Sequence, residues 1–176
     1  MTRMVALLGG INVCGHRKVP MAELRALAQA LGLENPRTYV ASGNLVFDGS
    51  GKPGEIETKL EEALQKRFGF KVDVLVRTAV QWRAYAQGNP LPEQAADQPN
   101  WLMLVIGKRA ATDADVAGMM TKASANERVV RADDALWIWF GDGAARSKLG
   151  TGAGKEFWTA RNHNTVVKLD DMLDAG

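Results

Sequence analysis

The order of apolar and amphipathic segments in the first 77 residues constrains the fold more than any other feature. Met4–Leu8 is a short apolar run typical of a buried strand, and Gly9-Gly10 ends it. Apolar residues at helical spacing follow between residues 20 and 32. Two β-prone runs, 37–41 and 45–47, then flank a Ser-Gly-Asn turn. This half therefore begins as strand, helix, strand, strand.

A second helix and a fourth strand complete the pattern. Residues 55–68 carry apolar side chains at helical spacing, with acidic residues at the start and basic ones at the end, as the helix dipole favours. Gly69 ends this helix, and Val72–Val76 is a strongly apolar strand. The order is β-α-β-β-α-β, which is typical of a ferredoxin-like plait.

The second half repeats much of this order. Thr78 and Gln81 form a possible capping box for a linking helix, and three prolines mark 88–100 as a connector. Trp101–Ile106 is predicted as a strand and Thr112 as a helix cap. A hairpin is then predicted across Asp133-Asp134.

The last 36 residues are less regular. Five glycines between residues 141 and 154 disfavour a long helix there, so we place the closing strand at Glu156–Thr159 and a terminal helix at Asn164–Leu173. We therefore predict an α+β protein of two tandem ferredoxin-like (βαββαβ) plaits, with antiparallel sheets, helices on one face and a C-terminal helix. The expected divisions are 1–77, a linking helix and connector at 78–100, and 101–176.

Composition limits the cellular locations and the partners that we expect for the protein. The single cysteine, Cys14, cannot form an internal disulfide, and no apolar run approaches the roughly 18 residues that a membrane span needs. We therefore expect a cytoplasmic protein without a membrane anchor. Residues 1–77 carry 11 basic and 8 acidic side chains, and the remainder carries 11 and 12, so the halves are +3 and −1. Nucleic-acid binders usually have a stronger basic bias, so such a partner is not favoured.

Three polar stretches, 9–18, 42–44 and 159–165, lie at the ends of predicted elements, where backbone donors and acceptors become available. We predict that they converge on a pocket for a small anionic ligand or nucleotide. The alternative is local: Ser, Gly and Asn are turn residues, and an asparagine at 162 or 164 can cap the terminal helix. The residues predicted to contact the ligand are Asn12, Lys18, Ser42, Asn44, Arg161, Asn162 and Asn164.

Catalytic and metal-binding patterns are sparse. His16 and His163 are the only histidines, and neither has the spacing of a metal motif, so we predict no metal site. The pattern identifies no cofactor. An enzyme that acts on a phosphorylated or nucleotide-like substrate is the alternative, with His16, His163 or Cys14 as acid, base or nucleophile. A structural or nucleic-acid-contacting plait is a third hypothesis.

Three separated motifs resemble one bacterial family. They are Leu7–Val13 with Lys18–Met21, Tyr39–Phe47, and Thr159–Val166, and they occur in the expected order across essentially the whole chain. The chain is similar to the bacterial domain-of-unknown-function family 1697, and the resemblance implies ferredoxin-like plaits but no established activity. The chain departs from that family's usual residues at Gly9, Cys14, Ala41 and His163.

Overall fold

The computed structural model describes residues 1–175 and divides the chain into two compact units. Unit 1 comprises Met1–Arg83 and the residues from Leu169 onward, and unit 2 comprises Ala84–Lys168. Each unit contains one four-stranded antiparallel sheet. These sheets, with their helices and a C-terminal helix, confirm the predicted α+β class. The divisions predicted at residues 77 and 100 stay a prediction.

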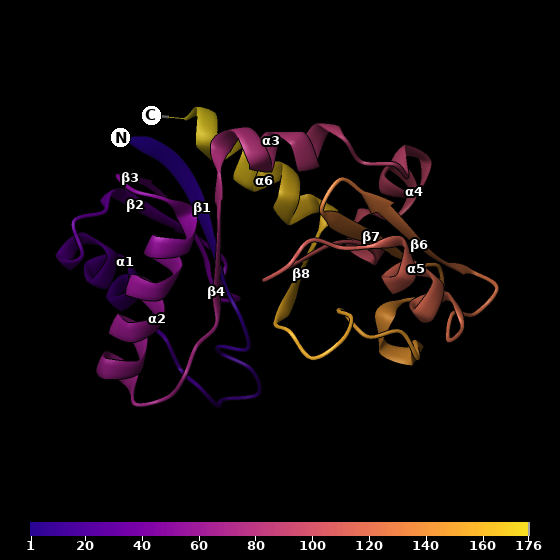
Figure 1. Cartoon of the computed structure of the whole chain (residues 1–176), viewed down its shortest axis with the longest axis horizontal. Coiled ribbons are helices and arrows are strands. Elements are labelled where there is room, and N and C mark those ends of the chain that lie inside the picture. The colour runs from indigo at the N-terminus through magenta and orange to yellow at the C-terminus, as the bar shows by residue number, and fades with distance from the viewer. Residues whose placement is uncertain (176) are drawn as a thin grey trace. The chain divides into compact units, whose positions relative to one another are not determined.

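Unit 1 has the expected order of elements, and its strands are arranged β2-β3-β1-β4, the order of a ferredoxin-like sheet. Figure 1 shows α1 and α2 on the same side of these strands. The elements are β1 (Thr2–Leu8), α1 (Met21–Ala30), β2 (Glu34–Tyr39), β3 (Asn44–Gly49), α2 (Pro53–Phe68) and β4 (Val74–Thr78).

Alternation along the strands explains the core of unit 1. Met4, Ala6 and Leu8 of β1 lie on one face and pack in the same cluster as Leu24 of α1 and Leu60 of α2. All five side chains are almost completely buried. Two helices with matching apolar stripes therefore cover one face of this sheet.

The edge strand β4 is protected by α2. Glu61 accepts a hydrogen bond from the Val74 amide at 2.9 Å, and Glu57 accepts one from the Val76 amide at 2.8 Å. Unpaired amides along an exposed edge are templates for pairing with another chain. Carboxylates of the covering helix therefore satisfy amides of this edge strand.

Unit 2 has the strand order β6-β7-β5-β8, which is equivalent to that of unit 1. The difference is the segment between the last two strands: unit 1 has the 16-residue α2 between β3 and β4, whereas unit 2 has a loop with one short 3₁₀ helix. Two of the remaining helices belong to both units, because α3 begins in unit 1 and the last residues of α6 belong to it. The remaining elements are α3 (Ala79–Gln87), α4 (Pro92–Asp97), η1 (Pro99–Trp101), β5 (Leu102–Gly107), α5 (Asp113–Met120), β6 (Glu127–Ala132), β7 (Ala135–Phe140), η2 (Ala144–Arg146), β8 (Trp158–Asn162) and α6 (His163–Asp174).

Glycines let the loop between β7 and β8 pack closely on the core. A Cβ atom at Gly107 or Gly152 would lie 2.6 or 2.7 Å from Trp158, so both positions require glycine. Leu149 and Trp158 join the cluster of buried residues formed by the strands and Met119 of α5. The glycine-rich loop, rather than a second helix, therefore covers part of this sheet face.

The prediction for the closing strand was wrong in its position. We expected Glu156–Thr159, but β8 runs from Trp158 to Asn162. Its register is fixed where Trp158 pairs with Gly107, the one β5 residue whose missing side chain makes room for the indole. The polar stretch 159–165 therefore forms most of β8 and the start of α6.

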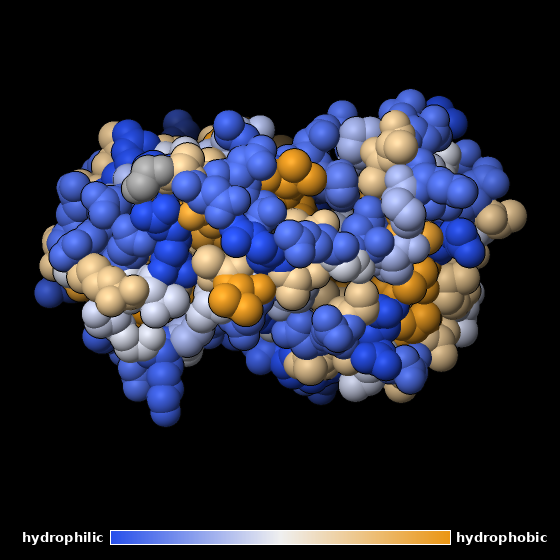
Figure 2. All heavy atoms as spheres, turned by 90° about the horizontal axis from the view of Figure 1, so that it is seen from above, coloured by the Kyte–Doolittle hydropathy of each residue, from blue (hydrophilic) through white to orange (hydrophobic). Residues whose placement is uncertain are grey.

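Polar residues predominate on the face shown in Figure 2, with apolar residues between them. Large apolar side chains that are exposed include Val13, Val80 and Val167. Single exposed apolar residues are ordinary at protein surfaces. Among residues 1–175, none of the helices has both the length and the apolar content that crossing a membrane would require.

Acid should weaken unit 2 through the start of α5. Arg109 donates to both carboxylate oxygens of Asp115, at 2.7 and 2.9 Å, and Asp115 also accepts from the Thr112 amide at 2.8 Å. The hydrogen bonds from Arg109 are the main reason why the pKa of Asp115 lies well below its usual range. A carboxyl group whose pKa is lowered by folding stabilises the folded state at pH values above its pKa in the unfolded chain, which is about 4. This stabilisation is lost as the pH falls below that value.

We therefore expect Asp115→Asn to destabilise the protein most at pH 7 and progressively less from pH 4 to pH 2. Urea unfolding at each pH measures the difference from the unmodified protein. A difference that stayed constant between pH 7 and pH 2 would mean that the charge of Asp115 contributes nothing.

Candidate functional site

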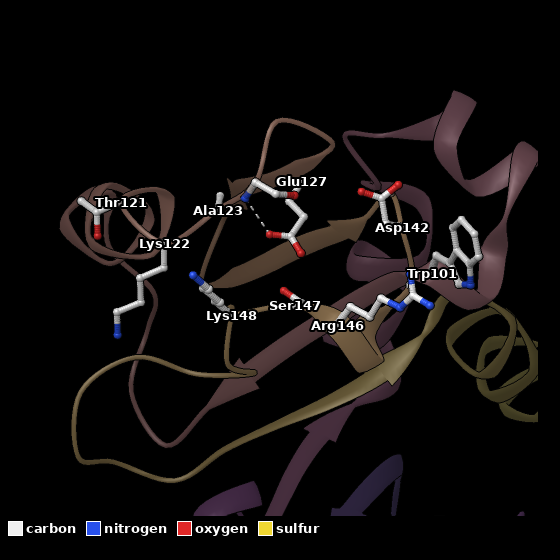
Figure 3. Close-up of a pocket in the computed structure, with 12 residues that line it drawn as sticks. Trp101, Thr121, Lys122, Ala123, Glu127, Asp142, Arg146, Ser147 and Lys148 are labelled. Carbon is white, nitrogen blue, oxygen red and sulfur yellow. Dashed lines mark hydrogen bonds between the residues drawn. The ribbon is translucent and has the colours of Figure 1, made fainter.

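A hollow of about 920 Å³ lies in unit 2, beside η2. It lies between the end of α5, the turn after β7 and the loop that includes η2 (Figure 3). These segments flank the region where the glycine-rich loop replaces the second helix of the plait. Its principal side chains come from Trp101, Lys122, Glu127, Asp142, Arg146 and Lys148.

Three of these side chains are cations without a partner among the described residues. Among residues 1–175, the side chains of Lys122, Arg146 and Lys148 make no hydrogen bond or ion pair, and all three are exposed. Arg109 and Arg131, in the same unit, are instead paired with Asp115 and Asp113. The hollow therefore presents positive charge that the described part of the chain does not neutralise.

Two carboxylates in the hollow have partners. Glu127 is only 6% exposed, and its carboxylate accepts a hydrogen bond from the Ser124 amide at 2.9 Å. Asp142 accepts from the Asn126 amide nitrogen at 3.1 and 3.2 Å. The cations therefore outnumber the carboxylates by three to two, and the carboxylates are held in place.

The sequence patterns do not point to this hollow. The glycine-rich segment 141–154 predicts only that no long helix forms there. The available signal was the combination of those glycines with Arg146 and Lys148, which stand close together in a segment that has no apolar stripe. Trp101 was predicted as the first residue of a strand, but it ends η1 and is half-buried.

Four predicted ligand residues lie in unit 1, and three of them have structural roles. Asn12 donates to the Val19 and Ala41 carbonyls at 3.0 and 2.7 Å and accepts from the Val19 amide at 2.8 Å. The fully buried Asn44 donates to the Tyr39 carbonyl and to Ser42 Oγ, at 2.8 and 3.1 Å. The structure therefore ties the loop 9–18 to the turn 40–44.

The two basic residues Arg17 and Lys18 of that loop differ in their contacts. Arg17 donates to the Gly10 carbonyl at 2.8 Å and lies 5.0 Å from the centre of the Phe70 ring. Lys18 is exposed, and its side chain makes no hydrogen bond or ion pair in the described part of the chain. Cys14 and His16 are exposed as well. Within this loop, Lys18 is therefore the cation available to an anion.

The other three predicted residues lie in unit 2. Arg161 is 8% exposed and donates to Thr159 Oγ1 and the Ala160 carbonyl at 2.8 and 2.9 Å, and burial lowers its pKa to about 10. Asn162 accepts from the Thr165 amide at 3.0 Å, so it caps α6. Asn164 is exposed and donates to Asn100 at 2.8 Å. A single pocket that all seven predicted residues share stays a prediction.

Groups that could hold a metal or perform acid–base chemistry are few. Within residues 1–175, no three His, Cys, Asp or Glu side chains gather as a metal site would require. His163 lies with its ring centre 6.1 Å from that of Trp137, and burial lowers its pKa. Burial therefore favours the neutral form of this imidazole.

Comparisons with known proteins agree with the fold. The chain is similar over 98% of its length, and 98% of the other chain, to the solved structure of the conserved bacterial protein SP0830 from Streptococcus pneumoniae, with 25% identity and a TM-score of 0.74. A comparison with curated proteins gives no match. The model of one protein family matches residues 1–137, which is most of the chain. The chain therefore belongs to the family described as "Protein of unknown function (DUF1697)".

Proposed function

We propose that the protein binds a small anionic ligand in the hollow of unit 2. The observation that supports this most is a group of three cations around one cavity, Lys122, Arg146 and Lys148, which have no partner within residues 1–175. A volume of about 920 Å³ falls within the range usual for small-molecule sites. Arginine and lysine donate strong hydrogen bonds to phosphate and carboxylate groups.

The test is the binding of inorganic pyrophosphate to the full chain, measured by calorimetry at low salt. We expect the double variant Arg146→Ala/Lys148→Ala to bind at least about tenfold more weakly, since one charge-assisted hydrogen bond contributes about 1.5–3 kcal/mol. Lys155→Ala is the matched control, because Lys155 is an exposed cation of the same loop that does not line the hollow. Equal losses in the control and the double variant, or no binding at all, would contradict the proposal.

The predicted pocket formed by Asn12, Lys18, Ser42, Asn44, Arg161, Asn162 and Asn164 is the competing location. Lys18→Ala tests it in the same experiment, because this side chain has no internal contact in the described residues. A loss of pyrophosphate binding in Lys18→Ala, with none in the double variant, would move the site to the loop that contains Lys18. We also propose the cytoplasm as the location, since the one cysteine offers no internal disulfide.

A further inference from the structure

Trp101 gives one wall of the hollow an aromatic side chain. Trp101 is half-buried, and its ring packs against Trp139 with centres 6.2 Å apart and planes tilted by 49°. Gly143 lies beside the indole: a Cβ atom there would come within 3.9 Å of Trp101. Its φ of 83° is a conformation that glycine adopts readily.

The charges of the hollow are separated along its length. Figure 3 shows Lys122 and Lys148 at one end and Trp101 at the other, with Asp142 and Arg146 on the Trp101 side. Asp142 is held by Asn126 through both carboxylate oxygens, which retain further capacity to accept hydrogen bonds. One end can therefore receive a planar ring with N–H groups, and the other end can receive an anion.

We propose that the ligand is a mononucleotide, a conclusion that rests on the proposed anion-binding function. Its base stacks on Trp101, an N–H group of the base donates to Asp142, and its phosphate lies between Lys122 and Lys148, with Arg146 near the sugar. Aromatic side chains can stack on any nucleobase, because every base has a π-face. A mononucleotide also matches the size of the hollow.

A polynucleotide is a poorer match to the same surface. The carboxylates of Glu127 and Asp142 line the hollow, and residues 78–176 carry 12 acidic against 11 basic side chains. Nucleic-acid binding depends on neutralising many phosphates in succession, which needs a basic surface. The charge of this region therefore favours a single nucleotide.

The experiment measures the affinity of the full chain for pyrophosphate, ribose 5-phosphate, AMP and a short oligoadenylate. We expect AMP to bind at least tenfold more tightly than ribose 5-phosphate, and to quench tryptophan fluorescence. Trp101→Leu should abolish this preference by weakening AMP binding more than pyrophosphate binding, whereas Trp101→Phe should preserve most of it. Far-UV circular dichroism and thermal unfolding show whether each variant is folded.

Asp142→Asn tests the contact with the base independently of the binding of the anion. The substitution removes a negative charge from the hollow, so pyrophosphate should bind as tightly as before or more tightly. AMP should bind several-fold more weakly, because a carboxylate acceptor for the base is lost. Weaker AMP binding without weaker pyrophosphate binding cannot come from a general loss of folding.

Binding of pyrophosphate and preference for AMP can each fail separately. If pyrophosphate binds through Arg146 and Lys148 but AMP binds no better than ribose 5-phosphate, the anion site stands and the mononucleotide inference is overturned. If the oligoadenylate binds far more tightly than AMP, the ligand is a polynucleotide and the inference is overturned. Absence of binding by all four compounds would contradict both proposals.

Discussion

Replacing Gly141 with alanine should lower the free energy of unfolding by about 3 kcal/mol, near the upper end of the effects of single substitutions. The new Cβ atom would lie 2.1 Å from the carbonyl oxygen of Asn126, and backbone cannot move aside as a flexible side chain can. The same carbonyl accepts a hydrogen bond from the Gly141 amide at 3.1 Å. The substitution therefore breaks the contact that joins the segment before β6 to the turn after β7, at the rim of the hollow.

Gly118→Ala is the matched control, because it makes the same chemical change inside α5. A Cβ atom at Gly118 meets nothing within 4 Å, so alanine should stabilise the protein by about 0.5–1 kcal/mol. Urea denaturation of both variants measures the two effects. If Gly141→Ala unfolded at the same urea concentration as the unmodified protein, the close approach of residues 126 and 141 would be disproved.

The fold could be predicted because its elements are specified locally. The apolar stripes of α1 and α2, Gly69 at the end of α2 with φ 81°, and the capping box of Thr112 and Asp115 all act within a few residues. The closing strand could not be placed correctly, because its register depends on Trp158 packing over Gly107, about 50 residues earlier. Long-range complementarity of this kind leaves no periodic signal.

The candidate site was harder to predict than the fold. Glycine and asparagine in a loop satisfy backbone groups as well as they bind ligands, and Asn44 and Asn162 are used for the former. The cations of the hollow form no motif, since Lys122 lies in the turn after α5 and Arg146 lies in the loop between β7 and β8. Only the arrangement in space brings them to one cavity.

Asn12→Asp should lower the free energy of unfolding by about 2–3 kcal/mol, since two donated hydrogen bonds are lost and a charge faces two carbonyl oxygens. The amide nitrogen of Asn12 donates to Val19 and Ala41, whereas a carboxylate can only accept. Asn12 has a φ of 54°, and aspartate tolerates this region almost as well as asparagine. Asn12→Asp therefore removes the hydrogen-bond donor without straining the backbone, whereas Asn12→Ala would do both.

Asn162→Asp makes the same change where the side chain only needs to accept. The oxygen of Asn162 caps α6 by accepting from the Thr165 amide, and a negative charge is favourable at a helix N-terminus. We expect its stability to equal or slightly exceed that of the unmodified protein in urea denaturation at pH 7. If Asn12→Asp were tolerated equally well, the loop 9–18 would not be held by Asn12, and the residue would again be available as a ligand contact. If only Asn12→Asp destabilises the protein, the difference between donor and acceptor shows that this asparagine serves the fold.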